Sequence, residues 1–293
     1  MGKMKEREHI YYFDGLRLMA CFFVVYMHTA ANPLRNGFGT DWELMNVITS
    51  LSFTAVPLFF MISGYLLISS PRTADIPTLL KKRLPRLIIP LAFWTLAAIL
   101  WSLLSWHDFS LHSFFSRCVD ALNQPAMVHL WYMYTLIAMY VLSPLIYGAI
   151  RSLDKNGHTY VLCLIGLVTL QSIASALLPT NYQRLCEIDL INKLRIFGGH
   201  MCSFLLGWYL GNMKKRIKPA ILFPAAALLL AVIVFGTHSV SHSSGEYTQT
   251  FQRQDSGFEV LLAASLFLIF SQYLNKPLKF LRSLQVVPLL FSV

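Results

Sequence analysis

The chain has 293 residues, of which 56% are hydrophobic and only 13% are charged, and its mean hydropathy is +0.55. These values lie well outside the range of soluble globular proteins and indicate a polytopic membrane protein. A formal net charge of +10 would suggest a nucleic-acid partner for a soluble protein. Here the basic residues follow the loops between apolar runs, so membrane topology explains them without nucleic acid.

Apolar runs of about 17 to 25 residues predict an all-α transmembrane bundle with eight complete spans. The runs lie near residues 11–31, 47–70, 87–106, 129–150, 160–178, 196–212, 219–236 and 257–274. A ninth run, Leu284 to Val293, is too short to cross a hydrocarbon core of about 30 Å as a helix. We therefore expect residues 1–293 to form a single membrane domain that is truncated at its C-terminus.

The lysines and arginines are distributed unevenly between alternate loops. The N-terminal segment and every second loop hold 17 of the 24, the remaining loops hold 6, and Arg17 lies within a span. Cytoplasmic loops carry the excess of basic residues in membrane proteins. The distribution therefore predicts a cytoplasmic N-terminus and a first span that runs from the inside to the outside.

The first apolar run, Tyr11 to Ala31, contains Arg17 and His28. Ionisable residues inside spans are costly and usually face a protein interior or a water-filled cavity. Eleven residues at about 100° each bring both side chains to within roughly 20° on one helix face, about 16 Å apart along the axis. This indicates a functional pair, although Arg17 could instead reach the inner headgroups and His28 the outer interface.

The next two spans carry small residues and then a cluster of positive charge. Ser63 and Gly64 permit a close helix contact, and packing alone accounts for them. The stretch from Ile76 to Arg86 places Lys81, Lys82, Arg83 and Arg86 at the cytoplasmic face. Anionic lipid headgroups are one partner for such a stretch, and a soluble phosphorylated cofactor is another.

At the predicted outer ends of two later spans lie His129 and Trp131, and His200. Trp131 has a ring suited to stacking on a sugar, but tryptophan at this depth also occurs as an interfacial belt residue. His129 lies at the same predicted depth as His28. A packing role remains open for His200, because the small residues that follow it favour helix contact.

Cysteine and histidine spacing predicts no metal site. Cys118 and Cys186 both fall in predicted outward loops, where an oxidising compartment would allow them to pair. His238 and His242 have i,i+4 spacing, but their serine-rich, loop-like surroundings favour a solvated pair over a zinc site.

Five segments together resemble the acyltransferase-3 family of integral-membrane acyltransferases. In chain order they are Asp14 to Arg17 with His28, Pro57 to Leu66, Lys82 to Pro90, His129 to Tyr132, and Leu205 to Gly211. The segments are distributed over most of the chain. Five such segments in the family's order, in a sequence with several predicted spans, indicate the family far more specifically than any one segment alone.

The resemblance implies a bundle of about ten transmembrane helices in a bacterial inner membrane. It implies transfer of an acetyl group from cytoplasmic acetyl-CoA to a hydroxyl of a surface glycan, such as enterobacterial common antigen. Acetyl-CoA would then be a donor substrate, with no permanently bound cofactor. The remaining expected partners are the glycan or lipid-linked glycan acceptor and membrane lipids.

Specific roles follow from the resemblance and from side-chain chemistry. His28 is the expected catalytic base, or the transient acyl carrier, and Arg17 is expected to hold the donor inside the bundle. Arg83 and Arg86 are expected to bind the phosphates of CoA, and Ser63 and Gly64 to line its passage. The acceptor-binding residues would be His129 and Trp131.

Two alternatives remain. Arg17 and His28 could line the path of a transporter or exporter of a small molecule or glycan precursor. The short C-terminus could instead mark an inactive, truncated acyltransferase.

Overall fold

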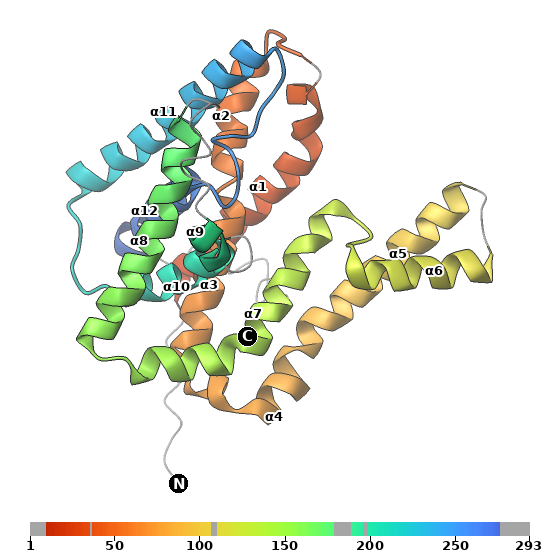
Figure 1. The fold of residues 1–293 in the computed structure, drawn as a ribbon, viewed down its shortest axis with the longest axis horizontal. Coiled ribbons are helices and arrows are strands. Elements are labelled where there is room, and N and C mark those ends of the chain that lie inside the picture. The colour runs from red at the N-terminus through yellow and green to blue at the C-terminus, as the bar shows by residue number, and fades with distance from the viewer. Residues whose placement is uncertain (1–9, 36, 107–109, 179–188, 196–198, 276–293) are drawn as a thin grey trace. The chain divides into compact units, whose positions relative to one another are not determined.

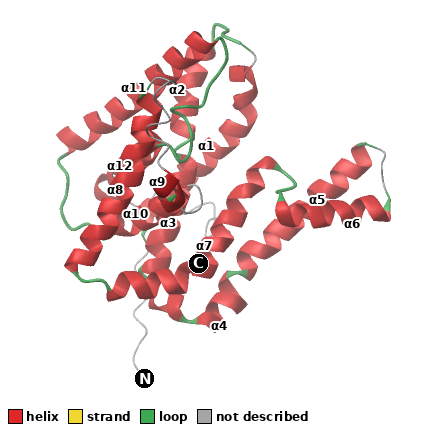
Figure 2. Ribbon diagram, in the orientation of Figure 1, coloured by secondary structure: helices red, strands yellow, loops and turns green. Residues whose placement is uncertain are grey.

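The computed structural model describes residues 10–35, 37–106, 110–178, 189–195 and 199–275. Within these ranges all regular structure is helical (Figure 2), which confirms the predicted all-α class. The chain divides into two compact units. The first combines residues 1–66 with residues 155–293, and the second is residues 67–154.

Eight helices begin in the described part of the first unit (Figure 1). They are α1 Tyr11–Arg35, α2 Trp42–Ser52, α3 Ala55–Ile68, α8 Lys155–Leu177, α9 Asp189–Leu194, α10 His200–Gly211, α11 Pro219–Ser244 and α12 Gly257–Tyr273. The described part of the second unit holds η1 Pro71–Ala74, α4 Ile76–Thr78, η2 Leu79–Arg83, α5 Pro85–Ser105, α6 Leu111–Asn123, η3 Val128–Leu130 and α7 Trp131–Ser152.

Five stretches of the described chain are long and apolar enough to cross a membrane. They are Trp42–Ile68, Ile76–Ser105, Val128–Ser152, Lys155–Leu177 and Pro219–Ser244. Each overlaps a predicted span, so the structure supports a multi-pass membrane protein.

The helices in the remaining three predicted spans are either less apolar or shorter than these five. Helix α1 has 25 residues, which is long enough, but Asp14, Arg17 and His28 reduce its apolar character. Helices α10 and α12 have 12 and 17 residues, fewer than the roughly 20 that a perpendicular span needs.

Segments expected as outward loops contain helix, among them residues 107–128 and 237–256. Residues 107–128 include α6, and α11 extends past residue 236 to Ser244, so His238 and His242 are helical rather than loop residues. Within this polar end the Ser243 hydroxyl donates to the Ser239 carbonyl at 2.7 Å, so the side chain bonds to the backbone of its own helix. Gly245, with φ of 76°, then ends the helix.

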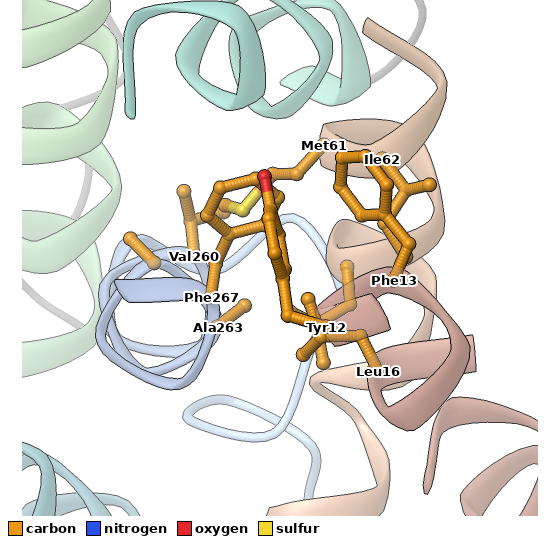
Figure 3. Packing of buried hydrophobic residues seen from close by; sticks show 10 residues of the cluster. Tyr12, Phe13, Leu16, Met61, Ile62, Val260, Ala263 and Phe267 are labelled. Carbon is orange, nitrogen blue, oxygen red and sulfur yellow. The ribbon is translucent and has the colours of Figure 1, made fainter. Parts of the chain in front are cut away.

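The core of the first unit forms where α1, α3 and α12 meet (Figure 3). Its buried residues are Tyr12, Phe13, Leu16, Leu58, Met61, Ile62, Val260, Ala263, Ala264 and Phe267. The α1 members recur at helical spacing, so one face of α1 is fixed against the bundle. At the base of this contact the Tyr12 N–H donates to Asn275 Oδ1 of the segment after α12, at 3.3 Å.

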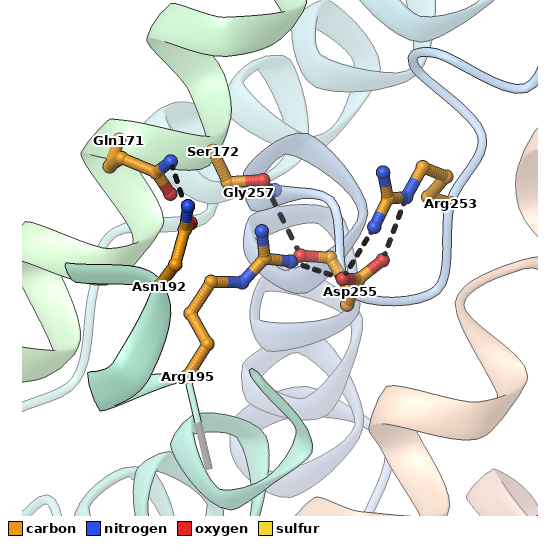
Figure 4. A network of polar contacts seen from close by, with 7 residues as sticks. All are labelled: Gln171, Ser172, Asn192, Arg195, Arg253, Asp255 and Gly257. Atoms are coloured by element: carbon orange, nitrogen blue, oxygen red, sulfur yellow. Dashed lines mark hydrogen bonds and ion pairs between the residues drawn. The ribbon is translucent and has the colours of Figure 1, made fainter. Parts of the chain in front are cut away.

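A polar network holds the loop before α12 in place (Figure 4). The guanidinium groups of Arg195 and Arg253 both donate to the Asp255 carboxylate. Ser172 Oγ accepts from the Gly257 N–H at 3.0 Å and thereby caps the start of α12 from α8. The loop and the start of α12 are thus tied to Arg195, the residue after α9, and to Ser172 of α8.

Candidate functional site

Helix α1 runs unbroken from Tyr11 to Arg35, so Arg17 and His28 lie on one continuous helix as predicted. The core cluster fixes the helix, and Arg17 lies at the edge of that contact, half-buried, with its Cζ 6.0 Å from the centre of the Phe13 ring. His28 is exposed on the surface of the protein and directly follows the buried Met27. The two side chains therefore lie at two positions along a helix whose adjoining face is packed in the core.

Gly64 lies in a close contact between α3 and α10. A methyl group added at Gly64 would overlap the Phe204 carbonyl, and one added at Gly207 would overlap the backbone of Met61. Small residues therefore allow these two helix backbones to touch, which is the packing interpretation of this segment. Ser63, half-buried, is its neighbour on α3; a donor-lining role for Ser63 and Gly64 stays a prediction.

In the second unit, Arg83 and Arg86 differ in their surroundings. Arg83 is 8% exposed and donates to Thr73 Oγ1 at 2.8 Å and to Ser70 Oγ at 3.3 Å. It ends the π-helical turn η2, where the Leu84 N–H donates to the Leu79 carbonyl. Such wide turns are rare and often occur at functional sites.

Around this turn the other basic groups face outward. Lys81, Lys82 and Arg86 are exposed. The turn thus combines one buried arginine, which holds it against the segment before α4, with three exposed cations of the kind that bind anionic groups.

His129 and Trp131 lie where η3 passes into α7. His129 is exposed and Trp131 is half-buried, with its ring centre 6.4 Å from that of Tyr132 in a perpendicular arrangement. Both residues belong to the second unit. The structure therefore groups Arg17, His28, Ser63 and Gly64 in one unit and the two arginines, His129 and Trp131 in the other.

His200 is buried at the start of α10. Its ring stacks on Phe60 of α3 with centres 4.9 Å apart and an angle of 28° between the planes. This contact lies in the α3–α10 interface and supports the packing role for His200.

Sequence reasoning missed one cluster of potential ligands, formed by Glu43 with His238 and His242. The helical spacing of the two histidines was visible in the sequence. Their approach to Glu43, 195 residues away from His238, depends on the packing of α2 against α11. Of the two cysteines that an oxidising compartment would allow to pair, Cys186 lies outside the described residues. Cys118 packs at the α5–α6 contact.

Comparison with known proteins adds a single finding. A family model described as an acyltransferase domain, that of the acyltransferase-3 family, matches residues 10–291. Neither the curated proteins nor the solved structures contain a match. Because the family match extends over almost the entire chain, and the described helices are those of a multi-pass membrane protein, this chain belongs to the acyltransferase-3 family of membrane acyltransferases.

Proposed function

We propose that the chain transfers an acetyl group from cytoplasmic acetyl-CoA to a hydroxyl of a surface glycan or lipid-linked glycan in a bacterial inner membrane. The observation that carries the proposal is the arrangement of Arg17 and His28 on the continuous helix α1, whose adjoining face is fixed in the core. An anchored helix holds a cation and a titratable base at constant depths, as transfer across a bilayer requires.

In the proposed reaction the acceptor hydroxyl attacks the thioester carbonyl of acetyl-CoA. The C–S bond breaks, CoA leaves as the thiolate, and His28 takes the proton of the attacking hydroxyl. Arg17 holds the donor by hydrogen bonds to its carbonyl or anionic portion. If His28 instead carries the acetyl group, its imidazole nitrogen attacks the thioester carbonyl, the C–S bond breaks and CoA leaves as the thiolate. The glycan hydroxyl then attacks the acyl-imidazole, the C–N bond breaks, and the released imidazole takes the proton of the hydroxyl.

The donor is bound from the basic turn. The exposed Lys81, Lys82 and Arg86 supply charge and donors for the CoA phosphates. The buried Arg83 fixes the turn that presents them and, in this proposal, binds the same phosphates. His129 and Trp131 position the acceptor, Trp131 by stacking on a sugar ring. Enterobacterial common antigen represents the acceptor class that we propose.

The test uses membranes that contain equal amounts of the parent chain or His28→Ala, supplied with labelled acetyl-CoA and endogenous glycan. The parent should label the glycan, and His28→Ala should lose about 10²–10⁴-fold of the rate, the usual contribution of a general base. His112→Ala is the matched control, because His112 is an exposed histidine on α6 that has no proposed part in the reaction. Equal labelling by the parent and His28→Ala would overturn the assignment of His28.

A second arm separates direct transfer from an acyl-enzyme. The parent is incubated with labelled acetyl-CoA in the absence of glycan, and peptides that contain His28 are examined by mass spectrometry. Acetyl on His28 would identify the two-step route, and label only on added glycan would identify the direct one. Uptake or export of acceptor without acetylation would favour a transporter.

A further inference from the structure

Three side chains with metal-ligand chemistry converge where α2 begins and α11 ends. Glu43 Oε1 lies 2.6 Å from His238 Nδ1 and 3.9 Å from His242 Nε2. One ligand atom from each of the three residues lies within 4.8 Å of the other two. All three belong to the first unit, so their arrangement does not depend on the placement of the second.

The chemistry of this set matches a known class of ligand. Two imidazoles and one carboxylate bind Zn²⁺ in many proteins, and a fourth position is then filled by water or substrate. With bonds of about 2.0–2.2 Å, ligands in a tetrahedron are about 3.3–3.5 Å apart. The observed separations of 2.6 and 3.9 Å fall on either side of that value, so an ion would bind as side-chain rotation widens the first separation and shortens the second.

The spacing of the two histidines on α11 explains why both approach Glu43. His238 and His242 are one turn apart on α11, their ring centres are 4.2 Å apart, and they therefore face Glu43 together. The His242 ring also stacks on Phe38 at 4.1 Å and meets Trp42 edge-on at 5.3 Å. These aromatic contacts restrict the histidine rings on one side, which preorganises the ligands.

Buried hydrogen bonds fix the two helices behind the cluster. Asn46, one turn after Glu43, donates to the Val234 carbonyl of α11 at 3.1 Å. Gln252 donates to Asn46 Oδ1 and to Ser50 Oγ, each at 2.7 Å. The supporting backbone is therefore held in place, while the three ligand side chains remain 40% to 57% exposed and open to an entering ion.

We propose that Glu43, His238 and His242 form a binding site for a divalent transition-metal ion of the Zn²⁺ type, which joins the start of α2 to the end of α11. A simple ion pair between Glu43 and His238 would require neither the second histidine nor its stacking on Phe38. The metal site accounts for all three residues and is independent of the proposed acyl transfer.

The experiment uses the full chain, purified in detergent with a tag that contains no histidine and freed of metal by a chelator. Co²⁺ is titrated in, and its visible absorption is recorded, because tetrahedral coordination by nitrogen and oxygen gives a distinct spectrum. The parent should bind Co²⁺ stoichiometrically, and Zn²⁺ should displace it. Glu43→Gln and His242→Ala should each weaken binding at least as much as the ~10–100-fold that loss of an outer-shell partner causes.

His112→Ala is again the matched control, because it removes one exposed histidine elsewhere in the chain. Zn²⁺ should raise the thermal midpoint of the parent and of His112→Ala, but not that of His242→Ala, since an ion stabilises only the fold that binds it. Size-exclusion elution and thermal unfolding of the metal-free protein show whether each variant folds. Equal Co²⁺ affinity for the parent and Glu43→Gln, or no binding by the folded parent, would overturn the proposal.

Discussion

At the scale of single residues, the shape of the Arg17 side chain should matter as well as its charge. A guanidinium offers a planar fork of donors, whereas lysine presents one compact charge. If Arg17 holds the acyl donor, Arg17→Lys should lower kcat/KM for acetyl-CoA by about tenfold or more, the effect of losing one to two kcal/mol of charged hydrogen bonding. Steady-state labelling at varied acetyl-CoA concentration measures this change.

Arg216→Lys is the control for that comparison, because Arg216 is exposed between α10 and α11 and has no proposed contact with donor. It should retain the parental kinetics. Retention of parental kcat/KM by Arg17→Lys as well would mean that Arg17 contributes only a charge near the inner headgroups.

A second residue-scale prediction concerns Asp255, which accepts from Arg195 and Arg253. The side chains of Asp255 and Arg195 are only 14% and 18% exposed, whereas that of Arg253 is 58% exposed. Asp255→Ala leaves the Arg195 guanidinium poorly solvated without its anion, and should cost about 1–3 kcal/mol of stability. Arg253→Ala should cost less than about 1 kcal/mol, because an exposed pair contributes little.

Thermal unfolding of both variants in one detergent measures the difference. The parent and Arg253→Ala should have similar midpoints, and Asp255→Ala a clearly lower one. If Arg253→Ala is the more damaging change, the exposed arginine rather than the buried one orders the loop before α12.

At the scale of helices, the contact between α3 and α10 should tolerate no added methyl group. Gly64→Ala and Gly207→Ala each place a Cβ into backbone of the facing helix, so the helices must separate, at a cost of typically 1–3 kcal/mol. Gly166→Ala on α8 is the matched control, since its Cβ would meet nothing within 4 Å and alanine favours a helix by up to ~1 kcal/mol.

The yield of monodisperse protein and its thermal midpoint in detergent distinguish these variants. The yield and the thermal midpoint should fall for Gly64→Ala and Gly207→Ala. For Gly166→Ala both quantities should equal or exceed those of the parent. A stable Gly64→Ala with lost donor binding would instead support the predicted role of Gly64 in the donor passage.

The helices also show what the sequence could predict. The position of Arg17 and His28 on one helix follows from local periodicity, and the structure places both on α1. Composition predicts helix ends less well. The serine-rich stretch after residue 236 is typical of a loop, but it continues α11 to Ser244, and the Ser243 hydroxyl bonds to the backbone of that helix. The partnership of Glu43 with His238 depends on tertiary packing, which local patterns do not report.

At the scale of the whole molecule, the distribution of charge makes a prediction about orientation. The N-terminal segment and alternate loops contain 17 of the 24 basic residues, which should keep those segments in the cytoplasm. Lys214, after α10, belongs to that set, whereas Ser243, at the far end of α11, belongs to the opposite side. Both residues are exposed, so a cysteine at either position would be accessible to a reagent in its own compartment.

Single cysteines are therefore introduced as Lys214→Cys and Ser243→Cys in a chain whose five native cysteines have been replaced. In cells with a permeable outer layer and an intact inner membrane, an impermeant maleimide should label Ser243→Cys and leave Lys214→Cys unlabelled until the inner membrane is opened. The reverse pattern would place the basic turn with Arg86 outside. Since acetyl-CoA is cytoplasmic, such a result would contradict donor binding at that turn as well as the predicted topology.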